Sequence, residues 1–396
     1  MIPKLRFLTA GESHGPALVA ILENLPAGIT FSKDQLMAHM RRRKLGFGRG
    51  GRQKIETDEV EVLSGLRSAS SIGSPISILI RNLDFANWEE VMSPWSENKK
   101  SHEKRIHTPR PGHVDFFSRV KMGFDDMRNG LERASARETA ARVALAYFTT
   151  TFLEELGIFI DSASLKIGSV DFSSSLSGVW SRERKLEIDD TPLRSLDQKG
   201  SESAMEEIRK VQKSGDTLGG KVELKVWGIP LGLGSYTHWD RKLEARLASQ
   251  LMALNAVKSV QLGSYDELNS SPGSSCHDTY GIDENQYVSI SSNQNGGITA
   301  GVSTGQEVSL TVQFKPISTL MNPLASVNIE RSTEEKAQIE RSDYCVIPAA
   351  GVICESIVSL VLAEAVLEKF GGDSLEEVKH RFEDWKKLCL KRSQLP

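Results

Sequence analysis

The amino-acid sequence predicts an α+β fold built from antiparallel sheets and long helices. Apolar and polar residues alternate with period two in three segments, 74–81, 221–227 and 307–314. Such alternation is typical of strands with one covered face, which favours antiparallel over doubly wound parallel sheets. Three other segments carry apolar residues at helical spacing or run too long for strands, namely 131–156, 240–257 and 354–370. Because the two kinds of segment come in mixed order, the class is α+β.

The organisation along the chain favours one domain over residues 1–396. Segment 164–214 is rich in Ser, Glu and Lys and is interpreted as a peripheral excursion rather than a linker. A short echo links the two halves: Glu132-Arg133-Ala134-Ser135 and Glu340-Arg341-Ser342-Asp343 each lie near the start of a long apolar helix that ends at glycine. Four similar residues leave both an internal duplication and chance open.

Composition is that of a soluble globular protein, with 39% hydrophobic and 26% charged residues. Strongly apolar stretches such as 143–148 and 357–361 are far shorter than the ~20 residues that cross a bilayer, so no membrane span is expected. The first residues show no signal peptide. Four separate cysteines without a C-x-x-C pair suit a reducing cytoplasm and indicate no metal site.

The charge distribution indicates an anion site. Net charge is −3, yet residues 41–54 hold seven basic side chains and no acidic one. Positive charge concentrated in a near-neutral chain focuses a field on one ligand. An RNA-binding or a general phosphate-binding protein is the alternative for this segment. Only Phe47 is available there for base stacking, which argues against RNA.

Two glycine-rich motifs are candidates for the ligand site. Residues 9–15 form a loop that would bring Ser13 and His14 to a ligand, although a plain turn is the alternative. The sequence there fits G-x-S-x-G, but too few residues precede it for the sheet that a hydrolase elbow needs. In residues 41–52, Arg49 and Arg52 offer bidentate donors for phosphate or carboxylate, with a solvated basic face as the alternative.

Three further motifs carry cations or loop donors. Two prolines flank Arg110 in segment 107–113, so a stiff loop presents Arg110 and His113. On one helix, Arg133 and Arg137 would lie a turn apart and grip one anion. The Gly- and Thr-rich loop 295–305 and segment 315–319 suit a phosphate, without any Walker or dinucleotide-binding sequence. A surface turn, an exposed helix face and a hairpin loop are the respective alternatives.

Together and in this order, the motifs resemble one family, chorismate synthase. The resemblance rests on Gly-Glu-Ser-His-Gly at 11–15, Gly-Arg-Gly-Gly-Arg at 48–52, Arg-Pro-Gly-His at 110–113, the stretch 133–138, Asn255-Ala256, the loop 295–305, segment 315–319 and Glu-Arg-Ser-Asp at 340–343. It covers residues 5 to 370. It implies a lyase that eliminates phosphate from 5-enolpyruvylshikimate 3-phosphate (anti-1,4) to give chorismate in the shikimate pathway, the route to aromatic amino acids.

The resemblance also implies roles for individual residues and a reduced FMN cofactor, without net redox change. Catalytic roles fall to His14, His113, Ser135 and Asp343. The substrate would bind Arg49, Arg52, Arg110, Arg137 and Arg341. FMN would contact Arg133, Ala134, Ser135, Asn255, Ala256, Ala300, Lys315, Pro316, Ile317, Ser318, Thr319 and Arg341. A weaker implication is an NADP phosphate site at Arg43 and Arg49.

Further implications concern fold, partners and location. The family fold is a β-α-β sandwich that assembles as a homotetramer. We expect a small-molecule substrate and an external flavin reductant, with NADPH at most an indirect reductant, and neither nucleic acid nor membrane as partner. We expect a cytoplasmic enzyme.

Overall fold

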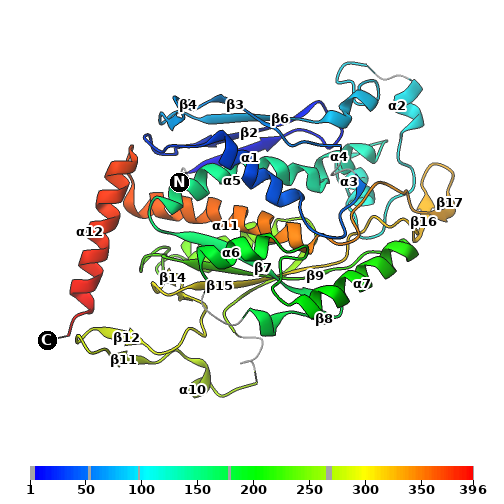
Figure 1. Ribbon diagram of the computed structural model, residues 1–396. Helices are drawn as coiled ribbons and strands as arrows, with labels where there is room; N and C mark the ends of the chain where they lie inside the picture. The colour runs from blue at the N-terminus through cyan, green and yellow to red at the C-terminus, as the bar shows by residue number, and fades with distance from the viewer. Residues whose placement is uncertain (1–4, 52–54, 97–98, 177–179, 265–269, 396) are drawn as a thin grey trace.

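The computed structural model describes the chain except for residues 1–4, 52–54, 97–98, 177–179, 265–269 and 396. Two antiparallel sheets form outer layers, and helices α5 (Thr139–Glu154) and α11 (Ile347–Phe370) lie between them (Figure 1). This is the predicted α+β class in the form of a β-α-β sandwich. Arg52, a predicted substrate-binding residue, lies outside the described residues.

The two sheets share one pattern of strand order. The first has the order β1 (Arg6–Ala10), β2 (Ala17–Glu23), β6 (Ile76–Arg81), β3 (Val60–Ser64). The second has the order β10 (Val257–Leu262), β15 (Val308–Phe314), β9 (Gly220–Trp227), β7 (Phe159–Ile167), β8 (Val170–Asp171). The predicted alternation is confirmed, because the apolar sides of β6, β9 and β15 are buried against the helices.

The remaining elements surround this sandwich. The other helices are α1 (Lys33–Lys44), α2 (Lys99–Glu103), α3 (Asp115–Met122), α4 (Arg128–Ala134), α6 (Arg182–Asp189), α7 (Gln198–Ser214), α8 (Leu243–Met252), α10 (Gly273–Cys276) and α12 (Leu375–Ser393). Short 3₁₀ turns are η2 (Leu83–Asn87), η3 (Ala136–Glu138), η4 (Ser173–Ser175) and η5 (Trp239–Arg241). Peripheral ribbons pair β4 (Leu66–Arg67) with β5 (Ser70–Ser71), β11 (Tyr280–Ile282) with β12 (Val288–Ile290), β13 (Ile298–Thr299) with β14 (Val302–Ser303), and β16 (Ala325–Asn328) with β17 (Thr333–Lys336).

The order of elements supports an internal duplication. The first half runs β1, β2, α1, β3, β6, α5, and the second runs β7, β9, α8, β10, β15, α11. In each sheet the first strand pairs with the second, the second with the fourth, and the fourth with the third. The echoed tetrapeptides therefore precede equivalent central helices. The similarity between the two halves therefore includes the order of strands and helices as well as these four residues.

Helix α11 is longer and more apolar than the sequence analysis recognised. It begins at Ile347, seven residues before the predicted start at 354, with Pro348 in its first turn. Within the described residues it is the one helix with the length and composition of a membrane span, yet 89% of its most apolar window is buried inside the protein. Its apolar surface is therefore covered by α5 and the second sheet, as in the core helix of a soluble protein.

The predicted helix 131–156 is wrong in its first part, because the chain breaks at Ser135. Ser135 has extended backbone angles (φ −66°, ψ 142°), and its hydroxyl accepts a hydrogen bond from the Arg137 amide. Arg133 and Arg137 therefore do not share a helix face. The Arg133 guanidinium donates to Thr9, whereas Arg137 is buried. The predicted helix 240–257 is likewise shorter, since α8 covers ten residues.

Segment 164–214 contains the end of β7 together with β8, η4, α6 and α7. Trp180 and Ile188 are buried there in a small separate apolar cluster with Ala163 and Leu176. The segment also makes an ion pair with α1: the Asp189 carboxylate on α6 accepts a hydrogen bond from Arg42 Nε at 2.7 Å. The single-domain organisation of the chain stays a prediction.

The central layer should dominate stability. Phe148 on α5 is fully buried between the sheets, so Phe148→Ala should lower the free energy of unfolding by about 3–5 kcal/mol through lost burial and a cavity. Urea denaturation at one protein concentration measures it. Leu186→Ala on α6, where the side chain is 62% exposed, is the control and should cost less than about 0.5 kcal/mol. Equal losses in the two variants would contradict this account of the core.

Candidate active site

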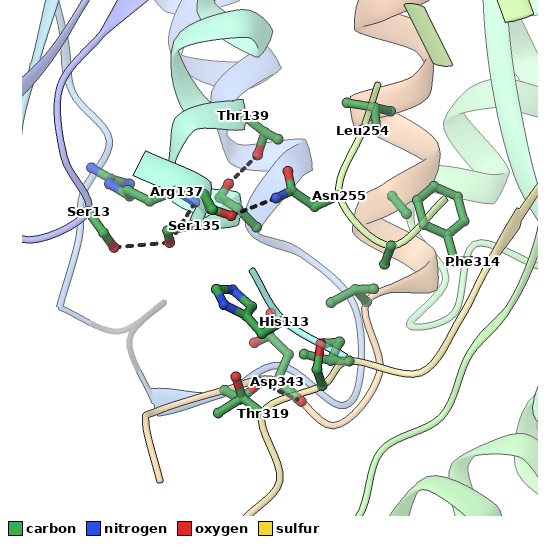
Figure 2. A pocket seen from close by; sticks show the side chains of 18 of the residues that line it. Ser13, His113, Ser135, Arg137, Thr139, Leu254, Asn255, Phe314, Thr319 and Asp343 are labelled. Atoms are coloured by element: carbon green, nitrogen blue, oxygen red, sulfur yellow. Dashed lines mark hydrogen bonds between the residues drawn. The ribbon is translucent and has the colours of Figure 1, made fainter. Parts of the chain in front are cut away.

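A cavity of about 550 Å³ is lined by residues from both halves of the fold (Figure 2). The first half contributes the loop after β1, the loop after α1 and the break between α4 and α5. The second half contributes the loops that follow α8 and β15 and the segment that leads into α11. The volume is in the range of small-molecule sites.

The lining is strongly cationic. Among the described lining residues the cations are Arg43, Arg49, Arg110, Arg137, Lys258, Lys315 and Arg341. The acids are Glu56, Glu340 and Asp343. The excess of positive charge, concentrated in a concave site with low-dielectric walls, attracts anionic ligands. The sequence prediction of one focused anion site is consistent with this geometry.

Carboxylates from distant segments hold the arginines in place. Arg49 Nη1 lies 2.8 Å from Asp343 Oδ2, Arg137 pairs with Asp58, and Arg341 pairs with Asp84. Burial alone would raise the pKa of Asp58, but the adjacent Arg43 and Arg137 guanidiniums lower it. Asp58 is therefore ionised, and its negative charge offsets the unfavourable desolvation of the two buried arginines.

Two arginine donors in the lining are nevertheless unsatisfied. Arg49 Nε and Arg137 Nη2 are buried and make no hydrogen bond to any described part of the chain, although Arg137 Nη2 lies 3.5 Å from Glu56 Oε2 in an ion pair. A buried donor without an acceptor is unfavourable by about 1–3 kcal/mol. A ligand oxygen in the pocket would relieve both. By contrast, each guanidinium nitrogen of Arg43 already has a protein partner, in Asp58, Thr139 or the Ala136 carbonyl.

His14 is fixed from the first-sheet side of the site. Its Nδ1 lies 2.9 Å from Glu132 Oε1, and its ring stacks on Trp88 with centroids 4.1 Å apart. Its backbone amide donates to Glu132 Oε2 at 2.8 Å. Burial by itself would raise the pKa of Glu132, but the contacts with His14 outweigh burial, so the pKa lies below its ordinary value. The predicted glycine-flanked loop thus brings both Ser13 and His14 to the pocket.

His113 is held by a second buried carboxylate. Its Nδ1 lies 2.6 Å from Asp115 Oδ1, and Asp115 is fully buried. Arg110 donates to Asp115 through its backbone amide, Nε and Nη2, and its Nη1 donates to Thr319 Oγ1 at 2.7 Å. Burial would raise the pKa of Asp115, but the hydrogen bonds from His113 and Arg110 hold it well below its usual range. The stiff loop 107–113 therefore presents an organised pair.

Hydroxyl and amide groups line one side of the pocket. Ser13 Oγ donates to Ser135 Oγ at 3.0 Å, and Asn255 Nδ2 donates to the Ala134 carbonyl at 2.7 Å. Figure 2 shows these groups together, with His113, Asp343 and Thr319 on the other side of the cavity. The contacts join the break after α4 to the loop after α8.

The segment after β15 lies along the cavity beside the His113 loop. Lys315 Nζ and Ser318 Oγ both donate to the Gly112 carbonyl, at 2.6 and 3.0 Å. Burial lowers the pKa of Lys315. Ile317, Ser318 and Thr319 also line the pocket, and an apolar wall follows from Met252, Leu254, Phe314, Ala349 and Ile353. This side therefore combines hydroxyls, one ammonium and a flat apolar surface.

The structure does not bring every predicted residue to this pocket. Arg133, Pro316 and Ala300 are not among its lining residues. Arg133 faces Thr9 and Gly11, because the break at Ser135 turns it away. Ala300 lies in the exposed turn between β13 and β14, where the Gly301 carbonyl accepts from the Leu243 amide. Loop 295–305 therefore packs at the start of α8 in this chain.

Several residues of the site escaped the sequence analysis. They are the carboxylates Asp58, Asp84, Asp115 and Glu132, and the ring of Trp88. The spacing of Asp115, two residues after His113, is a usable signal. Asp58 and Asp84 carry no such signal, since Asp58 pairs with Arg43 and Arg137, 15 and 79 residues away, and Asp84 with Arg341, 257 residues away. Within the described residues, no three His, Cys, Asp or Glu side chains cluster to hold a metal ion.

The fold and pocket define an enzyme that acts on a small polyanion with proton-transferring side chains. The family model described as "Chorismate synthase" matches residues 5–367. The chain is 42% identical to the chorismate synthase of Chlorobium luteolum over 388 residues, covering 96% of this chain and 98% of the relative. It is 44% identical to that of Chloroherpeton thalassium, with the same coverage. A solved structure titled "Crystal Structure of Chorismate Synthase" superposes with a TM-score of 0.78 at 34% identity, covering 99% of this chain and 100% of that one.

The chain belongs to the chorismate synthase family. It is a lyase of aromatic amino-acid biosynthesis, as the resemblance in its motifs implied. The alternative of an RNA-binding or simple anion-binding protein is not supported by these relationships.

The contact between residues 48–50 and 342–345 should be essential for the site. A Cβ added at Gly50 would lie 2.3 Å from the Ser342 carbonyl oxygen, so Gly50→Ala must separate the Gly50 amide from Asp343. We expect turnover to fall by about 10- to 100-fold, because Arg49 and Asp343 shift together. Phosphate release measures it.

Gly51→Ala is the matched control for this prediction. A Cβ at Gly51 meets none of the described residues within 4 Å, so turnover should stay within about twofold of wild type. Circular dichroism checks that both variants fold. Equal activity of the two alanine variants would show that the close approach at Gly50 does not matter.

Proposed function

We propose that this chain converts 5-enolpyruvylshikimate 3-phosphate to chorismate, using reduced FMN bound in the same pocket. The observation that carries the proposal is the pair of buried, unsatisfied donors of Arg49 and Arg137 in a cavity that also contains two carboxylate-bound histidines. The substrate has one phosphate and two carboxylates, so it supplies acceptors for several arginines. We assign substrate binding to Arg49, Arg110, Arg137 and Arg341, and on the resemblance also to Arg52.

His14 is the proposed proton donor to the leaving phosphate. Asn82 connects it to the arginines: Asn82 Nδ2 donates to the Gly15 carbonyl at 2.7 Å, and Asn82 Oδ1 accepts from Arg137 Nε at 2.9 Å. The His14 loop and Arg137 are thus tied to one amide. Negative charge grows on a departing phosphate, so these cations stabilise the transition state more than the ground state.

The residues proposed to hold FMN come mostly from the second half, with Ala134 and Ser135 added from the first. The isoalloxazine would lie against the small residues Ala134 and Ser135 and the apolar wall, and its phosphate would bind Lys315, Ser318 and Thr319. Asn255, Ala256 and Ile317 complete this side. When held by these residues, reduced FMN would supply electron density to the allylic system and take it back, which no side chain can do. Pro316 and Arg341 stay in the proposal by resemblance, whereas Arg133 and Ala300 would have to reach the cofactor from outside this pocket.

His113, Ser135 and Asp343 are the proposed residues on the flavin side. His113 follows Gly112, whose carbonyl receives Lys315 and Ser318. The Asp343 carboxylate accepts from the Gly50 amide at 2.5 Å and lies beside Arg49, so it is held at the pocket wall as a proton acceptor. Ser135 Oγ accepts a hydrogen bond from Ser13 Oγ. Because Ser13 directly precedes His14, this contact connects Ser135 to the loop that contains His14.

We also propose an external reductant, a homotetrameric assembly and a cytoplasmic location. Because every Arg43 nitrogen is engaged within the protein, an external reductant is favoured over an NADP phosphate site at Arg43 and Arg49. Reduced cysteines support a cytoplasmic enzyme: the four are free, and three of them are buried. A homotetramer is proposed from the family resemblance.

Anaerobic phosphate release from 5-enolpyruvylshikimate 3-phosphate tests the function. We expect release with chemically reduced FMN and none with oxidised FMN, because only reduced flavin can donate electron density. A third arm with NADPH and oxidised FMN should give no release. Activity in that arm would reveal an intrinsic reductase and restore the NADP site. No release in any arm from folded protein would overturn the proposed function.

A further inference from the structure

Glu132 lies behind His14 and outside the set of lining residues. Its carboxylate is 1% exposed and accepts from two groups of His14: Nδ1, at 2.9 and 3.1 Å from the two oxygens, and the backbone amide at 2.8 Å. Arg128, one turn earlier on α4, adds an ion pair at 3.3 Å. All of these contacts favour the ionised carboxylate.

An ionised Glu132 determines which nitrogen of His14 carries a proton. A carboxylate is only an acceptor, so the contact at 2.9 Å requires a hydrogen on Nδ1. Nε2 is then the other ring nitrogen of a side chain that lines the pocket. An imidazolium ring carries a second N–H, at Nε2, and this N–H is a proton donor.

The surroundings of His14 keep the ring in this orientation. The stacked Trp88 is itself buried, with the Arg128 guanidinium 4.8 Å and the Lys104 ammonium 5.4 Å from the ring centroid. Asp84, which pairs with Arg341, is a second carboxylate that interacts with the charge of His14. The charged groups around His14 and the Trp88 ring stacked on it are therefore Asp84 from η2, Glu132 and Arg128 from α4, and Lys104. Of the two carboxylates, only Glu132 is hydrogen-bonded to the imidazole.

We infer that Glu132 is the positioning residue that holds His14 as an Nε2–H donor for the leaving phosphate, a role that rests on the proposed function. As the C–O bond breaks, its electron pair goes to the phosphate oxygen, and the N–H bond at Nε2 breaks while an O–H bond forms. The C6 proton is lost to a base, and the C6–H electron pair forms the C1=C6 double bond. The former C1=C2 pair shifts to C2=C3, where it replaces the broken C3–O bond. His14 ends neutral with Nδ1–H intact, and solvent reprotonates Nε2 after phosphate leaves.

A double-mutant cycle with Glu132→Gln and His14→Ala tests this role. Glutamine keeps the size and an acceptor for Nδ1–H but removes the charge, so kcat should fall about 10²-fold while KM stays within about threefold. In the His14→Ala background the same change should cost less than about threefold, because Glu132 acts through the missing imidazole. Glu132→Asp, which retains the charge, should recover part of kcat.

Glu355→Gln is the matched control, since Glu355 is a buried carboxylate that pairs with Arg42 at 2.7 Å outside the pocket. It should lower stability while leaving kcat within about threefold. Binding of oxidised FMN, followed by flavin fluorescence, reports whether each variant folds. An equal loss of kcat from Glu132→Gln with and without His14 would overturn the inference, as would full activity of Glu132→Gln. Inactive wild-type protein would instead refute the proposed function.

Discussion

The pairing of buried arginines with carboxylates from distant segments organises the whole site. An isolated guanidinium is too costly to bury, so each arginine in the pocket needs an anionic partner before any ligand arrives. Asp58 holds Arg43 and Arg137, Asp343 holds Arg49, and Asp115 holds Arg110. These pairs fix the donors in advance, and the unsatisfied nitrogens of Arg49 and Arg137 mark where a ligand acceptor is needed. Preorganised charge of this kind requires little rearrangement when phosphate departs.

The duplicated architecture explains why partners so far apart in sequence meet. Each half ends in a central apolar helix, α5 or α11, and the two pack against each other inside the sandwich. The echoed tetrapeptides precede these helices, so Ser135 and Asp343 occupy equivalent places at one pocket. The first half supplies His14 and most of the arginines, whereas the second supplies the Lys315 strip and the apolar wall. Most of the proposed substrate contacts therefore come from the first half and most of the proposed flavin contacts from the second, while Ser135 and Arg341 cross this division.

Much of this could be predicted from sequence, and the failures have physical causes. Period-two alternation located β6, β9 and β15, because a strand with one covered face imposes it directly. The break at Ser135 could not be seen, since residues 132–138 contain no glycine or proline and a serine cap competes with the helix only in its tertiary setting. Motifs found the groups that face the ligand, such as His14 and Arg137. Their buried partners Glu132 and Asp58 depend on contacts across the fold.

A crystal structure with oxidised FMN and 5-enolpyruvylshikimate 3-phosphate bound tests the central claim most directly. The account predicts the substrate phosphate within hydrogen-bonding distance of His14 Nε2, and acceptors at Arg49 Nε and Arg137 Nη2. It also predicts that the Glu132–His14 and Asp58–Arg137 pairs are unchanged, because they are formed before the ligand binds. Substrate bound away from His14, or arginines that abandon their carboxylates to reach it, would contradict a preorganised site.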